Sequence, residues 1–198
     1  MVFYFLKTLC SKKEILLMIY LMMIDSEEDR SKFEILYKKY RKLMFVEAKG
    51  ILKDNYLAED AVHNSFIKIA KNISDIGEAE AKETKNFIMV ITRNVSLDMY
   101  RKRARSLNQE ISVEENEEAD IFITNEEKDL SDVVSEESPL LKIIRNLPAK
   151  YRDVFLLKYI NEYDNKKIAK ILNVSEEVVR QRISRGRNII EKKLEGIQ

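Results

Sequence analysis

The sequence is poor in the residues that most often carry metal binding, covalent cross-links or catalysis. Its 198 residues include one cysteine, one histidine and no tryptophan. A single cysteine, Cys10, cannot form an intrachain disulfide bond, which is typical of proteins in a reducing cytoplasm. A single histidine, His63, excludes a metal cluster built on histidines. P-loop, HExxH, CxxC and GxSxG motifs are all missing, so we expect no enzyme, no cofactor and no small-molecule substrate.

Proline and glycine are also scarce, with two and four residues. This scarcity argues against a fibrous or wholly disordered chain, and the apolar share of 45% is ordinary for a soluble protein. Apolar residues recur at intervals of three and four rather than two, which is the helical period. The sequence therefore predicts an all-α fold.

The net charge of +1 is close to zero, yet the charges are segregated along the chain. Residues 106–138 contain twelve acidic residues and one lysine, and they lack helical periodicity. Basic residues dominate on both sides, from Lys85 to Arg105 and from Leu140 to Arg187. The neutral total therefore does not exclude a nucleic-acid partner. We expect two small helical domains joined by an acidic linker.

The N-terminal residues 1–25 contain an unbroken apolar run from Ile15 to Ile24. The run is too short to span a bilayer as a helix. Lysines before it give a faint likeness to a signal peptide, but no small-residue cleavage site follows. Two interpretations remain, a mis-called start, with Met18, Met22 and Met23 as internal alternatives, or an accessory helix.

The remaining chain divides into domains at residues 26–105 and 139–198, on either side of the linker at 106–138. In the first domain, a loop at Asn72–Lys85 interrupts the helical pattern, and Gly50 is a plausible helix end. In the second, Ser138-Pro139 and Leu147-Pro148 are helix-start signals. The predicted helices are Phe33–Gly50, Asn55–Lys71, Asn86–Arg105, Pro148–Ile160, Asn165–Leu172 and Glu176–Leu194.

The last two predicted helices form a helix-turn-helix motif. Asp164 and Ser175 are suitable N-caps for the two helices, and "NVS" between them is a tight turn. The second helix of such a motif enters the DNA major groove.

Side chains on this second helix sort by face at 100° per residue. Val179, Ile183, Gly186 and Ile190 share the predicted core side. Arginines on the flanks suit phosphates, whereas central Gln and Arg suit base edges. The candidate DNA contacts are Glu177, Val178, Arg180, Gln181, Arg182, Ser184 and Arg185. The alternative is a solvated basic helix in an ordinary bundle.

Three motifs together resemble bacterial RNA polymerase sigma factors of the extracytoplasmic-function (ECF) group. "LPAKYRDVFLLKYI", "KKIAKILNV" and "SEEVVRQRISRGR" resemble the C-terminal DNA-binding domain of that family. "LAEDAVHNSFIKIAKN" resembles its polymerase-binding helix, and "FIMVITRNVSLDMYRKRAR" resembles the helix that opens and reads the minus-ten element. The resemblance implies a cytoplasmic protein whose partners are core RNA polymerase, promoter DNA and an anti-sigma factor.

The resemblance also implies which residues carry these contacts. The polymerase-binding candidates are Asp60, Val62, His63, Asn64 and Ile67, whereas we expect Phe66 to lie in the core. The minus-ten candidates are Arg93, Asn94, Arg101, Lys102 and Arg103. The family further implies that the Asn72–Lys85 loop holds one flipped base. The C-terminal helix-turn-helix is expected to bind the minus-thirty-five element.

This chain departs from the family pattern at several positions. Phe87 stands where tryptophan is common, and Lys167 stands where glutamate is usual. Val178, Gln181 and Gly186 replace the commoner Thr, Ser and Ala. A helix-turn-helix repressor or response-regulator output protein is the alternative function, and a helical adaptor that binds only protein is a third. The repressor would leave the N-terminal motifs unused, and the adaptor would leave the arginine-rich face unexplained.

Overall fold

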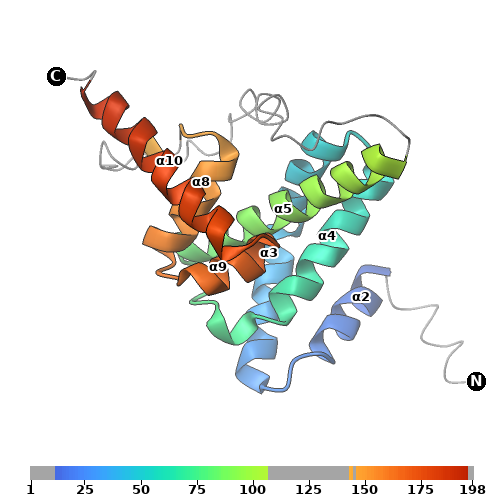
Figure 1. Ribbon diagram of the computed structural model, residues 1–198. Coiled ribbons are helices and arrows are strands. Elements are labelled where there is room, and N and C mark those ends of the chain that lie inside the picture. Colours follow the sequence, from blue (N-terminus) through green and yellow to red (C-terminus); the bar gives the residue numbers. More distant parts are fainter. Residues whose placement is uncertain (1–11, 107–142, 145, 196–198) are drawn as a thin grey trace, which may run out of the picture. The chain divides into compact units, whose positions relative to one another are not determined.

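The computed structural model describes residues 12–106, 143–144 and 146–195. Every regular element within these ranges is a helix, and the predicted all-α fold class is confirmed (Figure 1). The chain divides into two compact units, Met1–Met99 and Tyr100–Gln198. Cys10 and nearly all of the predicted acidic linker lie outside the described residues, as does the helix start expected at Ser138-Pro139.

The N-terminal domain is built from long helices whose starts are fixed by side-chain caps. Its elements are α2 (Lys12–Leu21), α3 (Glu27–Leu52), α4 (Asn55–Ala70), η1 (Ile73–Asp75) and α5 (Lys82–Ser106). The Ser26 hydroxyl accepts a hydrogen bond from the Asp29 amide at 3.4 Å, which caps α3. The Asp54 carboxylate accepts from the amides of Tyr56 and Leu57 at 2.8 and 3.0 Å, which caps α4.

Helix α3 continues past Gly50, so the helix end expected at that glycine is wrong. Lys53 makes the turn instead, with a left-handed φ of 53°, and its amide donates to the Lys49 carbonyl. The Asp54 cap follows at once, so the chain reverses between α3 and α4 without needing the glycine. A Cβ added at Gly50 would meet nothing within 4 Å.

An aromatic cluster forms the core where α2, α3 and α4 meet. Phe33 and Tyr37 recur on one face of α3 and contact Phe66 of α4, with ring centroids 5.8 and 4.8 Å apart. Tyr20 of α2 completes the cluster and is only 1% exposed. Phe66 is fully buried, which confirms its predicted core position. Helix α2 therefore belongs to the packing of this domain, which supports the accessory-helix interpretation of residues 1–25.

The segment between α4 and α5 is an ordered connection held against α3. The Tyr40 hydroxyl donates to the Ala79 carbonyl at 3.0 Å, and Lys32 Nζ donates to the Ile76 carbonyl at the same distance. The loop expected at Asn72–Lys85 contains one short 3-10 helix, η1. Helix α5 begins four residues earlier than predicted, because the Thr84 hydroxyl bonds the Glu78 carbonyl at 2.7 Å and stabilises the first turn.

The C-terminal domain combines short helices with one long helix. Its described elements are α8 (Ala149–Phe155), η2 (Leu156–Ile160), α9 (Asn165–Leu172) and α10 (Glu176–Glu195). The predicted helix at 148–160 is continuous but changes at Leu156 to the wider π geometry. Helix α10 packs against α8 and α9. Val154, Leu157, Ile168 and Val179 are fully buried and form the centre of this domain.

Candidate functional site

Helices α9 and α10 form the helix-turn-helix with the caps that the sequence predicts. The Asp164 carboxylate accepts from the Lys167 amide at 2.7 Å, and the Ser175 hydroxyl accepts from the Val178 amide at 3.3 Å. Between them Asn173 has a left-handed φ of 53°, a conformation that asparagine tolerates well. The Val174 amide then bonds the Ala169 carbonyl at 3.0 Å, which closes the turn.

The faces of α10 sort as its helical period predicts. Val179, Ile183, Gly186 and Ile190 are buried against the rest of the domain. Five of the candidate DNA contacts are exposed, namely Glu177, Arg180, Gln181, Ser184 and Arg185. The other two, Val178 and Arg182, are half-buried at the edges of this face. The structure therefore brings the seven predicted residues onto one side of one helix.

Arg180 and Glu177 form an ion pair within α10. The Arg180 Nη2 and Nε atoms donate to Glu177 Oε2 at 2.7 and 3.0 Å. The hydrogen bond and charge of Arg180 lower the pKa of Glu177, so this carboxylate is ionised at neutral pH. Both side chains are more than half exposed. Because such exposed pairs are weak, Arg180 can exchange its carboxylate partner for another anion.

Two features of α10 depend on α8 and η2 and could not be found from the sequence. A Cβ added at Gly186 would lie 2.5 Å from Cε2 of Phe155, so the glycine permits a close approach between the two helices. Arg187 is absent from the predicted contacts, yet it is exposed, and its Nη2 donates to the Tyr159 hydroxyl at 2.7 Å. The only sign in the sequence that Arg187 belongs beside the candidate DNA contacts is its position two helical turns after Arg180.

Lys167 departs from the family pattern, and the structure gives it a local partner. Its ammonium lies over the Tyr163 ring, 3.8 Å from the centroid. This contact lies at the start of α9, the first helix of the helix-turn-helix.

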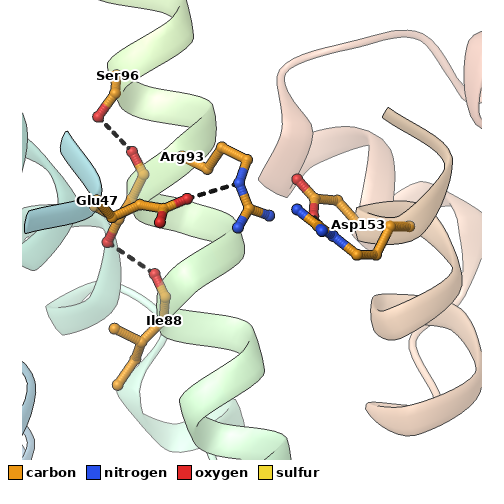
Figure 2. Close-up of polar contacts among 7 residues, drawn as sticks. Glu47, Ile88, Arg93, Ser96 and Asp153 are labelled. Atoms are coloured by element: carbon orange, nitrogen blue, oxygen red, sulfur yellow. Dashed lines mark hydrogen bonds and ion pairs between the residues drawn. The ribbon is translucent and has the colours of Figure 1, made fainter. Parts of the chain in front are cut away.

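Helix α5 divides the minus-ten candidates into two groups. Arg101, Lys102 and Arg103 are exposed in its last turns, whereas Asn94 is half-buried. The Asn94 Nδ2 atom makes no hydrogen bond within the described residues. Arg93 points toward α3, where its Nε donates to Glu47 Oε1 at 2.7 Å (Figure 2). Arg93 is thus buried and paired with a carboxylate of α3, whereas Arg101, Lys102 and Arg103 lie on the exposed surface.

Two hydroxyl groups of α5 near Arg93 donate hydrogen bonds back to carbonyls of the same helix. The Thr92 hydroxyl donates to the Ile88 carbonyl at 2.9 Å, and the Ser96 hydroxyl donates to the Thr92 carbonyl at 2.8 Å (Figure 2). Both hydroxyls are buried, and these bonds satisfy them without a partner from another helix. Small polar residues therefore fit the inner side of this helix.

Helix α4 presents most, but not all, of the polymerase-binding candidates. Asp60 and Asn64 are exposed, and His63 and Ile67 are half-buried. Val62 is only 3% exposed, so its side chain supports the helix from the core. Asn64 Nδ2 donates to Met99 Sδ of α5 at 3.8 Å, and His63 Nδ1 lies 2.6 Å from the Tyr20 hydroxyl of α2. We call Asp60, His63, Asn64 and Ile67 the α4 face.

Two other kinds of site are absent from the described ranges. Histidine, cysteine, aspartate and glutamate side chains there form no group of three or more that could hold a metal ion. In the same ranges no helix is both long and apolar enough to cross a membrane.

Comparisons with known proteins match both domains. The family described as Sigma-70 region 2 matches residues 36–106, and Sigma-70, region 4 matches residues 138–190. The ECF RNA polymerase sigma factor SigW of Bacillus subtilis is 27% identical over 84% of this chain and 90% of its own length. SigM of the same species is 23% identical over 71% and 82%. A solved structure of RpoE with the anti-sigma factor NepR from Bartonella quintana is 17% identical, covers 80% of this chain and 94% of that one, and has a TM-score of 0.34.

Proposed function

Because this chain belongs to the ECF group of RNA polymerase sigma factors, which bind core RNA polymerase and promoter DNA, we propose a division of labour between its two domains. The C-terminal domain reads duplex DNA at the minus-thirty-five element through α10. The N-terminal domain holds core polymerase through the α4 face and acts on the opened minus-ten strand through the end of α5. The chain itself catalyses no reaction and works in the cytoplasm beside polymerase.

The observation that carries the duplex-reading role is the sorting of side chains on α10. Its buried side leaves Gln181, Ser184 and Arg185 together in the middle of the exposed side. Gln and Arg can each make two hydrogen bonds to a purine edge, adenine for Gln and guanine for Arg. Arg180 and Arg187 lie two turns apart on one flank of these residues and suit the phosphates of a groove wall.

The minus-ten role rests on the exposed cations at the end of α5. Arg101, Lys102 and Arg103 supply the positive charge that a single strand requires, and Tyr100 beside them is 44% exposed. The hydrogen bonds that hold the segment between η1 and α5 against α3 favour a rigid loop for a flipped base. Arg93 is proposed to position α5 through Glu47.

The regulatory partner is proposed from the family. Sigma factors of this group are held inactive by anti-sigma factors, so we propose an anti-sigma partner for this chain as well. A helix-turn-helix repressor is not favoured, since a Sigma-70 region 2 match at residues 36–106 has no place in such a protein.

The duplex-reading role is tested by two substitutions in α10. Promoter fragments are first selected with the wild-type holoenzyme, and binding is then measured across base changes and salt concentrations. Arg185→Ala is expected to cost about 1–3 kcal/mol and to relax preference at one or two base pairs. Arg180→Ala is expected to weaken binding evenly across sequences and to make the salt dependence shallower, as for a lost phosphate contact.

The opposite pattern would refute this assignment of roles. If Arg185→Ala left every base preference intact while Arg180→Ala changed one, the base-reading and phosphate positions would have to be exchanged. If neither variant altered binding by the holoenzyme, α10 would not be the reading helix.

A further inference from the structure

After its charged first turn, helix α2 is apolar on all sides from Ile15 to Leu21, but only one side of it is buried. Tyr20 is 1% exposed, whereas Met18 is 58% exposed and Met22, just after the helix, is 79% exposed. At 100° per residue, the outward residues share one side, opposite Tyr20. We call Ile15, Met18, Ile19 and Met22 the α2 stripe. A helix that is hydrophobic all round is normally covered on both sides, and contiguous exposed apolar side chains mark interaction sites.

The α2 stripe is held in a fixed place on the N-terminal domain. The Tyr20 ring lies 5.6 Å from the Phe33 ring and 5.7 Å from the Phe66 ring, measured between centroids. After the helix, Arg30 Nε of α3 donates to the Ile24 carbonyl at 2.8 Å. Helix α2 contacts both α3 and α4 (Figure 1). The domain therefore presents the stripe as a rigid surface.

The position of α2 places it at one border of the α4 face. His63 belongs to that face, and its Nδ1 atom meets the Tyr20 hydroxyl at 2.6 Å. Asp60, His63 and Ile67 fall within an arc of about 60° around α4, given 100° per residue. Helix α5 borders the same face at Asn64 through Met99. The α2 stripe therefore lies on the exposed side of the helix that borders the α4 face at His63.

The size and chemistry of the stripe favour one occupant. A stable interface uses roughly 20–30 residues on each side, far more than these four, so the stripe belongs to a larger contact. The adjacent α4 face supplies the rest of such a contact. A lipid surface would select a helix with a basic polar face along its length, but the charges of α2, Lys12, Lys13 and Glu14, are confined to its first turn, and Ile15–Ile24 contains no charged residue. A second copy of the chain bound through the stripe alone would bury too little surface.

We propose that the α2 stripe docks on an apolar surface of core RNA polymerase beside the part that binds the α4 face. This inference rests on the proposed role of the α4 face and extends it. Methionine suits the contact because its unbranched, polarizable side chain adapts to an irregular apolar surface. Residues before the Sigma-70 region 2 match, which begins at residue 36, thereby contribute to polymerase affinity.

The test compares one substitution in the stripe with a matched one elsewhere. Met18→Glu places a charge in the stripe, and Val46→Glu places one on α3 at a similar exposure of 65%. Binding of each full-length variant to immobilised core polymerase is measured by interferometry. Met18→Glu is expected to weaken binding at least tenfold, and Val46→Glu to change it less than twofold. The Asp60→Arg, Asn64→Arg double variant tests the α4 face separately and is also expected to weaken binding.

The outcomes separate this inference from the proposed function. If the double variant weakened binding but Met18→Glu did not, the stripe would be excluded while the α4 face stood. If Met18→Glu and Val46→Glu weakened binding equally, the effect would not be specific to the stripe. A lower melting temperature of free Met18→Glu would mean that the chain covers the stripe itself. A change from dimer to monomer on sedimentation would assign it to a second copy. Either result would overturn the inference.

Discussion

In α5, Arg93 donates to Glu47 of another helix, whereas in α10 Arg180 donates to Glu177 one turn earlier in the same helix. Side chains of the first pair are 10% and 21% exposed, and those of the second are 56% and 61% exposed. An enclosed pair between helices fixes their relative position, because losing one partner leaves a charge without compensation. An exposed pair within one turn contributes little and exchanges easily. The same residue type thus links two helices in α5 and remains on the exposed surface in α10.

The two domains also hold their helices together by different packing. The N-terminal domain depends on an aromatic cluster contributed by three helices, with Tyr20 from α2 completing it. The C-terminal domain depends on the close approach of α10 to Phe155 that Gly186 permits. Large aromatic side chains fill the space between α2, α3 and α4, whereas a glycine without a side chain lets α10 approach α8 closely.

The largest expected effect is on the aromatic cluster. Tyr20→Ala should lower the free energy of unfolding of the N-terminal domain by about 3–5 kcal/mol, because it leaves a cavity between three helices. Hydrogen exchange measured by mass spectrometry should show faster exchange in α3 and α4 and unchanged exchange in α9 and α10. Unchanged protection in α3 would mean that α2 is dispensable for this core.

Tyr20→Phe separates the hydroxyl from the ring. It keeps the ring contacts but removes the hydrogen bond with His63, for a cost of about 0.5–1.5 kcal/mol at neutral pH. Burial raises the pKa of Tyr20 above its ordinary value of 10.0. The stability linked to this shift is complete below pH 10 and is lost as the pH rises further. The cost of Tyr20→Phe should therefore shrink in alkaline chemical-unfolding measurements.

The next effect compares the two arginine pairs directly. Glu47→Gln should lower the free energy of unfolding by about 1.5–3 kcal/mol, because it removes the charge that compensates Arg93. Glu177→Gln should leave stability unchanged within the error of urea unfolding, since its pair is exposed. Equal effects of the two substitutions would remove the distinction between the pairs.

Alanine substitutions at two helical glycines are expected to have effects of opposite sign. Gly186→Ala should destabilise the C-terminal domain by about 1–3 kcal/mol, because its Cβ would overlap the Phe155 ring. Gly50→Ala should stabilise the N-terminal domain by about 0.5–1 kcal/mol, because its site is open and alanine favours helix. Calorimetry checks both signs.

A second substitution tests the physical reason for the first of these effects. In a Phe155→Leu background, Gly186→Ala should cost less, since the smaller side chain leaves room for the added methyl group. If the cost were the same in both backgrounds, the contact with Phe155 would not explain why glycine stands where the family more often has alanine.

Local patterns in the sequence determined the elements and much of the candidate site. Helical periodicity identified the buried side of α10, and capping residues identified both starts of the helix-turn-helix, because these properties depend on neighbours within a few residues. The same period predicted that Phe66 is buried. The order of the motifs along the chain by itself indicated a member of the ECF group. The helical period also predicted that the seven candidate DNA contacts lie on one side of α10.

Tertiary structure decided what depends on residues far apart in the chain. Arg93 and Arg180 look alike in the sequence, and only the packing of α5 against α3 gives Arg93 its partner Glu47, 46 residues away. Burial of Val62 in the core limits its candidate role in binding polymerase. The close approach of the Phe155 ring, 31 residues earlier in the chain, explains the glycine at Gly186. The apolar run at Ile15–Ile24 was ambiguous in the sequence, because an all-apolar helix has no preferred side until another surface covers one. Contact of Tyr20 with α3 and α4 decided which side faces inward.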